Sequence, residues 1–393
     1  MKTCIYCAVD KDESDFSDEH IWPDALGGDY LSDFWRTGDV CQRCNNLSGV
    51  FVDGSFIKSW AGSAERATGA REYLAVKHAD RAALPLDYLG KLEDERIAVD
   101  EVADFWSGPC GANIIHFRPA DKDDVWISYA GGDPRAGNKV SKAGRVYIVL
   151  TTDKQFWIAV TINSVRAHFK KAALFVTNIA VQGDAGWLKN PDRTDSVQSA
   201  DMQIIDTIVE AGRSGTQLHL KALFQVDLGS RLLAKLGLAI GYKAFGSRFL
   251  ATAYGNNLRL GFREADPEKR KAIPVKGTGY LRGGNLGGAE AVMTWTGAWV
   301  LVLMRTRQTL TLTVITPSGK VMHVVVCDDP ALINELPSAY DDGKVWITVP
   351  SLGAAVGPLW LPDYLAHQLH ETELPELAAL AAKRVDLATL PAC

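Results

Sequence analysis

The sequence predicts an α+β fold in which a small N-terminal module precedes a larger region with an antiparallel sheet. Four of the 7 cysteines lie at or before position 44, whereas strand-like runs begin only near residue 114. Segments that favour helices stand between and after those runs. A chain of 393 residues has room for two or three domains. We place the first domain at residues 1–60 and a mixed α+β region, with room for two subdomains, at residues 61–393.

The composition indicates a folded protein with a mildly acidic surface. Hydrophobic residues make up 47% of the chain and charged residues 23%. The net charge of −5 excludes a surface that is basic throughout, so any affinity for nucleic acid must come from a local group of Lys and Arg. No stretch reaches the roughly 20 apolar residues that span a bilayer, and the N-terminus lacks the apolar run of a secretion signal. We therefore expect a cytoplasmic protein without membrane contact.

Runs rich in Val, Ile, Thr and aromatic residues predict strands in two parts of the chain. The first part, residues 114–181, contains VWISYA, RVYIVLTT, FWIAVTI and ALFVTNIAV. The second part contains TWTGAWVLVLM, TLTLTVIT, VMHVVVC and VWITVP. Turn-forming residues at 317–320 separate two of the later runs and predict a β-hairpin there.

Three segments are predicted to be mainly helical or connecting. Residues 56–106 are rich in Ala and charged residues and include KLEDERIAVDEVADFW. Apolar residues recur at helical spacing within residues 226–246, where Ser230 is the expected N-cap. Residues 364–387 also favour helices, with Pro375 at a helix start or break.

Two C-x2-C pairs stand out at the N-terminus, Cys4 with Cys7 and Cys41 with Cys44. Each pair can place both thiolates on a tight turn, so that four sulfurs close a tetrahedral shell around one zinc ion. A closed shell has no position for water, and we therefore predict that this zinc is structural. The remaining cysteines are scattered and are predicted to be free thiols: Cys110, Cys327 and Cys393.

The segment between the cysteine pairs carries the motif Glu-His-Ile-x-Pro-x-x-Leu-Gly-Gly, which begins at Glu19, and Asn45 follows the last cysteine. This frame resembles the HNH, or ββα-metal, endonucleases, in the zinc-ribbon variant with the motif EHIxPxxLGG. The resemblance covers residues 1–55. It implies a treble-clef-like ββα-metal module with structural zinc, and a metal-dependent hydrolysis of phosphodiester bonds in DNA.

The resemblance also implies residue roles. His20 would be the general base that deprotonates the attacking water, and Glu19 and Asn45 would be ligands of a catalytic Mg²⁺ or Mn²⁺ ion. Oxygen ligands suit such hard cations. The family often has Asn or His at the position that aligns with Arg36, so the usual side chain is missing there. Asp53 is a further acidic residue to which the resemblance assigns no role.

The N-terminal module is itself acidic, because residues 1–60 contain 5 Lys and Arg against 11 Asp and Glu. DNA would therefore be held by basic residues elsewhere in the chain. The candidate group is Arg259, Arg263, Arg270, Lys271 and Arg282. A solvated charged surface is the alternative interpretation of the same residues.

Taken together, these features predict an HNH endonuclease that acts on double-stranded DNA, in the setting of antiviral defence in bacteria or of a mobile element. One alternative is a catalytically inactive zinc-dependent protein that binds nucleic acid or serves as a scaffold. Another is a nuclease effector that an activating ligand or partner protein switches on through the C-terminal region. Oligomeric state, substrate form and cleavage pattern stay open at this point.

Overall fold

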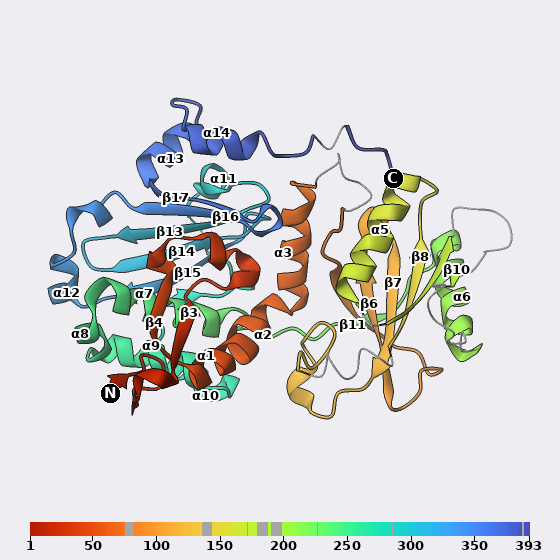
Figure 1. Cartoon of the computed structure of the whole chain (residues 1–393), viewed down its shortest axis with the longest axis horizontal. Coiled ribbons are helices and arrows are strands. Elements are labelled where there is room, and N and C mark those ends of the chain that lie inside the picture. Colours follow the sequence, from red (N-terminus) through yellow and green to blue (C-terminus); the bar gives the residue numbers. More distant parts are fainter. Residues whose placement is uncertain are drawn as a thin grey trace. The chain divides into compact units, whose positions relative to one another are not determined.

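The computed structural model describes residues 1–74, 82–135, 144–170, 172–178, 188–189, 199–225, 227–284, 286–386 and 389–393 (Figure 1). Contacts divide the chain into two compact units. Unit 1 comprises Met1–Ile57, Thr68–Tyr73 and Gln225–Arg384, and unit 2 comprises Lys58–Ala67, Leu74–Phe224 and Val385–Cys393. The first segment of unit 1 thus ends near the predicted boundary at residue 60, and residues 225–384 lie in the same unit.

Both units combine helices with sheets whose strands are mainly antiparallel, so the predicted α+β class is confirmed. Among the described residues, no helix has the length and apolar character needed to cross a bilayer.

The larger sheet of unit 1 has six strands in the described residues, and every neighbouring pair is antiparallel. Across the sheet the order is β12 (Gly277–Thr278), β15 (Val321–Cys327), β14 (Leu310–Ile315), β13 (Trp299–Arg305), β16 (Lys344–Val349) and β17 (Ala354–Trp360). The predicted hairpin is confirmed, because the turn at residues 317–320 joins β14 to β15, with Gly319 at a φ of +86°. Apolar side chains of β13, β14 and β16 form much of the core of this unit.

The longest helix of unit 1 is α7 (Ser230–Phe245), which is buried along most of its length and packs against β15 and α9 (Ala253–Arg263). The helix predicted over residues 226–246 is confirmed in its described part, except that Gly229 occupies the N-cap in place of Ser230. The shorter helices are α8 (Ser247–Leu250), α10 (Pro267–Lys271), α11 (Glu290–Met293), α12 (Pro330–Asn334), α13 (Leu361–Gln368) and α14 (Pro375–Ala381). Pro375 starts α14, one of the two outcomes predicted for it.

The N-terminal segment of unit 1 contains two small antiparallel hairpins and a helix. These are β1 (Lys2–Thr3) with β2 (Asp10–Lys11), and β3 (Phe16–His20) with β4 (Arg36–Cys41). The helix α1 (Gln42–Ser48) follows β4 directly and continues through π-helical Gly49–Asp53 into α2 (Gly54–Ile57). Trp22 packs against Trp299 of β13 with ring centroids 5.6 Å apart, so this segment shares the core of unit 1.

The sheet of unit 2 has seven strands in the described residues. Their order is β10 (Leu188–Lys189), β9 (Ala173–Asn178), β8 (Arg145–Leu150), β7 (Asn113–Pro119), β6 (Glu101–Ser107), β5 (Asp87–Leu92) and β11 (Leu220–Lys221). The pair β8 and β9 is parallel and the others are antiparallel. The helices are α3 (Trp60–Arg71), of which residues up to Ala67 belong to this unit, α5 (Gln155–His168) and α6 (Ser199–Ser214).

Three predictions of local structure in unit 2 are wrong. The polar segment KLEDERIAVDEVADFW forms the end of β5, a connecting loop and most of β6, not a helix. The run FWIAVTI lies in α5 and not in a strand, and VWISYA begins with the short 3₁₀ helix Asp124–Trp126. α5 connects the parallel strands β8 and β9, and such a connection must cross over the sheet, which favours a helix. A short apolar run does not by itself distinguish a buried helix from a strand.

The prediction of free thiols is correct for Cys327 and wrong for the other two scattered cysteines. Cys110 and Cys393 form a disulfide across 283 residues of sequence. The C-terminal residues are held at a second point, because Trp157 Nε1 donates a hydrogen bond to the Pro391 carbonyl at 2.7 Å. The tertiary structure brings these cysteines together, and nothing in their spacing indicates it.

Candidate functional site

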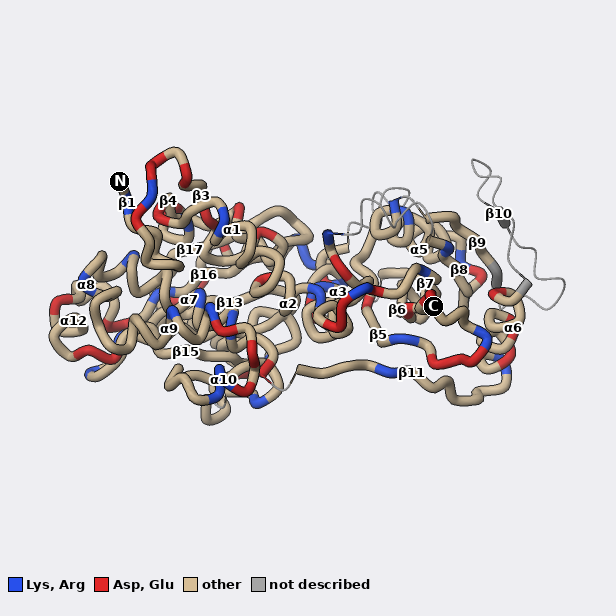
Figure 2. The backbone as a smooth tube through the Cα atoms, turned by 90° about the horizontal axis from the view of Figure 1, so that it is seen from below, with Lys and Arg blue, Asp and Glu red and all other residues tan. Residues whose placement is uncertain are grey.

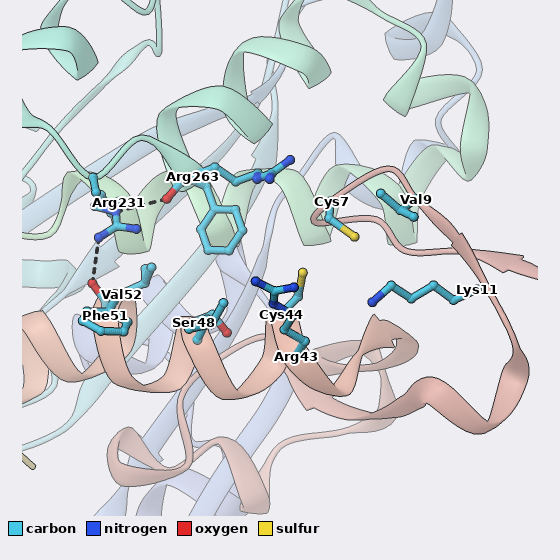
Figure 3. Close-up of a pocket in the computed structure, with 13 residues that line it drawn as sticks. Cys7, Val9, Lys11, Arg43, Cys44, Ser48, Phe51, Val52, Arg231 and Arg263 are labelled. Atoms are coloured by element: carbon cyan, nitrogen blue, oxygen red, sulfur yellow. Dashed lines mark hydrogen bonds between the residues drawn. The ribbon is translucent and has the colours of Figure 1, made fainter. Parts of the chain in front are cut away.

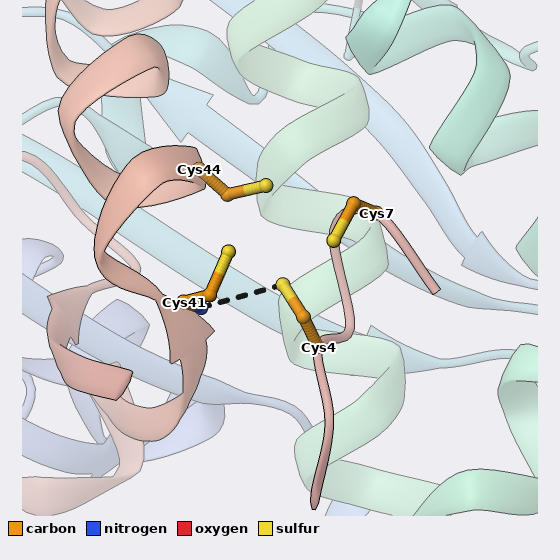
Figure 4. Close-up of side chains that lie close together, drawn as sticks. All are labelled: Cys4, Cys7, Cys41 and Cys44. Atoms are coloured by element: carbon orange, nitrogen blue, oxygen red, sulfur yellow. Dashed lines mark hydrogen bonds between the residues drawn. The ribbon is translucent and has the colours of Figure 1, made fainter. Parts of the chain in front are cut away.

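The four N-terminal cysteines converge on one point (Figure 4). Their sulfur atoms all lie within 4.8 Å of one another. Cys4 and Cys7 belong to the turn between β1 and β2, Cys41 ends β4, and Cys44 lies in the first turn of α1. Four sulfurs at such distances can surround one tetrahedral zinc ion.

Hydrogen-bond donors reach two of the sulfurs, whereas burial raises the pKa of Cys7 and the hydrogen bond with Cys4 raises the pKa of Cys44. The backbone N–H of Cys41 donates to Cys4 Sγ at 3.3 Å, and Lys11 Nζ donates to Cys41 Sγ at 3.3 Å. A hydrogen bond from Cys44, helped by nearby backbone N–H groups, lowers the pKa of Cys4 to about 4. Because the four sulfurs lie close enough to close one tetrahedral shell, this set of residues fits structural zinc.

The hairpin β3–β4 and the helix α1 form one connected framework beside the cysteines. His20 is opposite Arg36 in the strand register, and the register is irregular between Ser17 and Glu19. Asn45 of α1 reaches back to β3, where its Nδ2 donates to Ser17 Oγ at 3.1 Å and to the Asp18 carbonyl at 2.8 Å. α1 is thereby fixed against the strand that ends in His20.

His20 is the last residue of β3, and its side chain is 23% exposed. Its Nδ1 lies 2.9 Å from Asp24 Oδ1, and its Nε2 lies 3.0 Å from Asp29 Oδ1. Arg36 also reaches Asp29, with 3.3 Å between NH2 and Oδ1. One atom each of His20, Asp24 and Asp29 lies within 4.8 Å of the others, so these three residues, which we call the His20 group, could hold a metal ion.

The rest of the motif holds this group against the sheet of unit 1. The Leu26 carbonyl accepts hydrogen bonds from Trp22 Nε1 and from Thr348 Oγ1 of β16, each at 2.8 Å. A Cβ at Gly28 would lie 1.9 Å from the Trp22 carbonyl oxygen, and Gly27 has a φ of +96°. Only glycine satisfies both positions without strain, and the turn that results carries Asp24 and Asp29 to His20.

Glu19 points away from the His20 group into the core of unit 1, where its side chain is 3% exposed. Lys235 of α7 lies 2.6 Å from Glu19 Oε1 and 2.7 Å from Asp53 Oδ2, and Lys235 is fully buried. Tyr6 donates to Glu19 at 3.1 Å. Lys235 Nζ also donates to the His20 carbonyl at 3.4 Å, so this buried Lys235 group supports the backbone at the end of β3.

The charges of the Lys235 group are not balanced, since two carboxylates share one ammonium. Burial raises the pKa of Glu19 and of Asp53, although Lys235 opposes this shift. Burial lowers the pKa of Lys235, but Asp53 and Glu19 together outweigh it and raise the value overall. Lys235 is therefore charged at neutral pH and is neutralised from two sides.

The family of the N-terminal segment follows from a comparison of the chain with family models. Residues 4–61 match the model of the HNH endonuclease family. The resemblance predicted from the motif EHIxPxxLGG is thereby confirmed, and we call residues 4–61 the HNH segment. The match indicates a nuclease or another function that involves nucleic acid. No curated protein and no solved structure matches the chain.

The basic residues expected to hold DNA have different interaction partners. Arg270 pairs with Asp227, and Lys271 Nζ lies 2.7 Å from Glu268 Oε1. Arg259 Nε donates to the Ile5 carbonyl of the HNH segment at 3.3 Å, and burial lowers its pKa. Figure 2 shows acidic residues interspersed with basic ones around α10. Arg263 and Arg282 are exposed, and DNA binding by this group of residues stays a prediction.

Sequence reasoning missed Asp24, Asp29 and Lys235. Asp24 follows His20 by four residues and lies inside the motif, so its position was a usable signal. Lys235 lies 215 residues from His20, on a helix whose apolar spacing indicated only burial. Its role depends on how α7 packs against the HNH segment, which no local pattern reveals.

Proposed function

We propose that the chain is a metal-dependent HNH endonuclease that hydrolyses phosphodiester bonds in nucleic acid, with His20 as general base and double-stranded DNA as the expected substrate. The observation that carries this proposal is the match of the HNH segment together with the position of His20 at the end of β3, between two carboxylates. In this interpretation β3, β4 and α1 form the ββα-metal module, and the four cysteines hold its structural zinc.

Asp24 orients the base, since the position aligned with Arg36 lacks the usual Asn or His. It accepts a hydrogen bond from Nδ1 of His20, which fixes the ring and leaves Nε2 to receive the proton of the attacking water. Arg36 acts differently here, because its guanidinium pairs with Asp29. Asp29 contacts Nε2, and its side chain is 56% exposed, so it can turn from His20 towards a cation.

Two sets of oxygen ligands are candidates for the catalytic Mg²⁺ or Mn²⁺ ion, which would stabilise charge on the scissile phosphate. The family resemblance implies Glu19 and Asn45, and these are held by Lys235 and by β3 respectively. The structure adds Asp24 and Asp29, whose side chains are more than half exposed. Since ligands of Mg²⁺ must reach both solvent and substrate, we favour the aspartates.

Cleavage of supercoiled plasmid in Mg²⁺, in Mn²⁺ and in EDTA tests the proposal. His20→Ala should lower the rate by about 100- to 10,000-fold, because a general base contributes on that order. His219→Ala is the matched control, since His219 is an exposed histidine of unit 2. Zinc content and DNA affinity should stay unchanged in both variants. A His20→Ala protein that cuts like its parent would place any nuclease activity elsewhere.

One alternative has specific support. Glu19 is bound by a buried lysine, as expected if the HNH segment has become a non-catalytic zinc-dependent scaffold. A nuclease switched on by a ligand would also be inactive alone. Plasmid cleavage in any metal by the parent protein, abolished in His20→Ala, excludes the scaffold. We include antiviral defence in the proposal because the family resemblance implies it.

A further inference from the structure

A cavity of about 620 Å³ lies between the helix of the HNH segment and α9 (Figure 3). Its volume is within the range of about 300 to 1,000 Å³ that is usual for small-molecule sites. The walls come from the β1–β2 turn, from α1 and its continuation, and from the C-terminal end of α9. The lining residues are Cys7, Val9, Lys11, Arg43, Cys44, Leu47, Ser48, Phe51, Val52, Arg231, Phe262, Arg263 and Ala265.

The cavity has a defined apolar floor. Phe51 and Val52 lie in the π-helical stretch, a distortion that is frequent at functional sites. Arg231 of α7 ties the two walls together, because it donates to the Phe51 carbonyl at 2.9 Å and to the Phe262 carbonyl at 3.1 Å. Leu47 is 47% exposed although it is a large apolar side chain. The site is thus held open by main-chain hydrogen bonds and offers apolar surface to a ligand.

Apart from the sulfurs of Cys7 and Cys44, which belong to the zinc site, the charged groups of the lining are positive. The lining contains Lys11, Arg43, Arg231 and Arg263 and no Asp or Glu. Lys11 is bound to Cys41, and Arg231 to main-chain carbonyls. The side chains of Arg43 and Arg263 lie at the edge formed by Cys44 and Cys7 and are exposed (Figure 3). This local positive charge contrasts with the acidic composition of the HNH segment and favours an anionic ligand.

The cavity is separate from the His20 group. Asn45 faces β3, where it contacts Ser17 and Asp18. Successive residues of an α-helix are turned by 100°, so Arg43 and Leu47, two positions before and after Asn45, project from the opposite side of α1. A ligand in the cavity would therefore occupy a second site on the same helix.

We propose that this cavity binds a nucleotide, with the base against Leu47, Phe51 and Phe262 and the phosphate against Arg43 and Arg263. Aromatic side chains stack on any base, and guanidinium groups match the geometry of phosphate oxygens. The nucleotide is either a free effector or one unit of a single strand, since both offer the same chemistry. The inference goes beyond cleavage and does not require His20.

Isothermal titration of the zinc-loaded full chain with AMP, adenosine, inorganic phosphate and a single-stranded oligonucleotide tests the proposal. AMP should bind at least about tenfold more tightly than adenosine or phosphate alone, because it contacts both the floor and the arginines. If the protein binds the oligonucleotide but not AMP, the nucleotide in the cavity is one unit of a single-stranded nucleic acid. Absence of binding by both AMP and the oligonucleotide would overturn the proposal.

Substitutions of lining residues test whether AMP or the oligonucleotide binds in this cavity. Arg43→Ala combined with Arg263→Ala should weaken AMP or oligonucleotide binding by about 10- to 100-fold, the usual loss for hydrogen bonds to charged groups. Arg307→Ala, an exposed arginine of unit 1 outside the cavity, is the control and should bind like the parent. Leu47→Asp should weaken binding comparably by placing a carboxylate in the cavity. Zinc content is measured in each variant. Unchanged affinity in both the double variant and Leu47→Asp, with zinc retained, would overturn the proposal.

His20→Ala separates this inference from the nuclease proposal. It should bind AMP or the oligonucleotide like the parent, since His20 is not part of the cavity. Loss of nucleotide binding in His20→Ala would contradict a separate site, whereas loss of cleavage alone leaves the cavity unaffected.

Discussion

Each unit contains a cation held between two carboxylates and accompanied by a tyrosine. In unit 1, Lys235 is held by Glu19 and Asp53, and Tyr6 donates to Glu19. In unit 2, Arg145 of β8 binds Glu101 through two hydrogen bonds of 2.8 Å and Asp201 at 2.6 Å. Tyr147 donates to Asp201 at 2.7 Å. The two groups share one arrangement, although only the first adjoins a family motif.

The difference lies in solvent access. Lys235 is fully buried, whereas the Arg145 side chain is 11% exposed and Glu101 is 21% exposed. The Arg145 group connects β6, β8 and α6, which is a structural task. The Lys235 group connects α7 to the HNH segment in the same way. A buried carboxylate in such a group is therefore explained by packing, which agrees with our proposal that Asp24 and Asp29, and not Glu19, hold a catalytic ion.

Loss of zinc should have the largest effect on stability. This effect should be seen in unit 1 and not in unit 2. Cys41→Ser removes one of four sulfurs, and structural zinc contributes on the order of 10 kcal/mol in small modules. We expect unit 1 to lose zinc and hydrogen-exchange protection around Lys235, while the Arg145 group stays protected. Cys327→Ser, at a buried cysteine without a ligand role, is the control. Full zinc content in Cys41→Ser would contradict the site.

Replacing either buried cation should destabilise its own unit. Lys235→Met leaves two buried carboxylates without a cation and should cost about 3 to 5 kcal/mol. Arg145→Met should cost less, because Glu101 retains solvent contact. Urea denaturation of both variants measures the free energy of unfolding. Equal or reversed costs would show that the exposure of the carboxylates does not decide the energy of these groups.

Acid should weaken unit 2 through His116 of β7. Burial lowers the pKa of His116 from 6.5 to about 3, so between these values only the unfolded chain binds the proton. The stability of unit 2 should therefore fall as the pH decreases through this interval, by about 2 kcal/mol between pH 7 and pH 5. Thermal unfolding of the parent and of His116→Phe across this range measures the difference. If the stability of both proteins depends on pH in the same way, His116 is not the cause of the loss of stability in acid.

The smallest expected effect on stability is that of Glu19→Gln, which leaves one carboxylate for one ammonium in the Lys235 group. We expect a loss of at most about 1 kcal/mol, since the ion pair of Lys235 with Asp53 remains. If Glu19 has only this structural role, Glu19→Gln should retain metal-dependent cleavage, whereas Asp29→Asn should lose it. Asp12→Asn, at an exposed aspartate, is the control. Loss of cleavage in Glu19→Gln with activity retained in Asp29→Asn would favour the ligand set implied by the family.

The sequence by itself determined the features that depend on short-range spacing. Cys4, Cys7, Cys41 and Cys44 predicted their own cluster, because two residues between cysteines place both sulfurs on one turn. The motif at Glu19 predicted the HNH segment, and the apolar spacing near Ser230 predicted α7. Runs rich in Val, Ile, Thr and aromatic residues predicted β13, β14, β15 and β16, because such side chains pack well in a sheet.

The tertiary structure alone decided which distant groups meet. The disulfide between Cys110 and Cys393, and the contact of Lys235 with Glu19, join residues far apart in the chain. It also decided that FWIAVTI is helical, because α5 connects two parallel strands. Glu19 and His20 are neighbours in sequence, but opposite faces of β3 send one to a buried lysine and the other to two exposed aspartates. Burial and long-range packing set these roles, and neither is encoded in a local pattern.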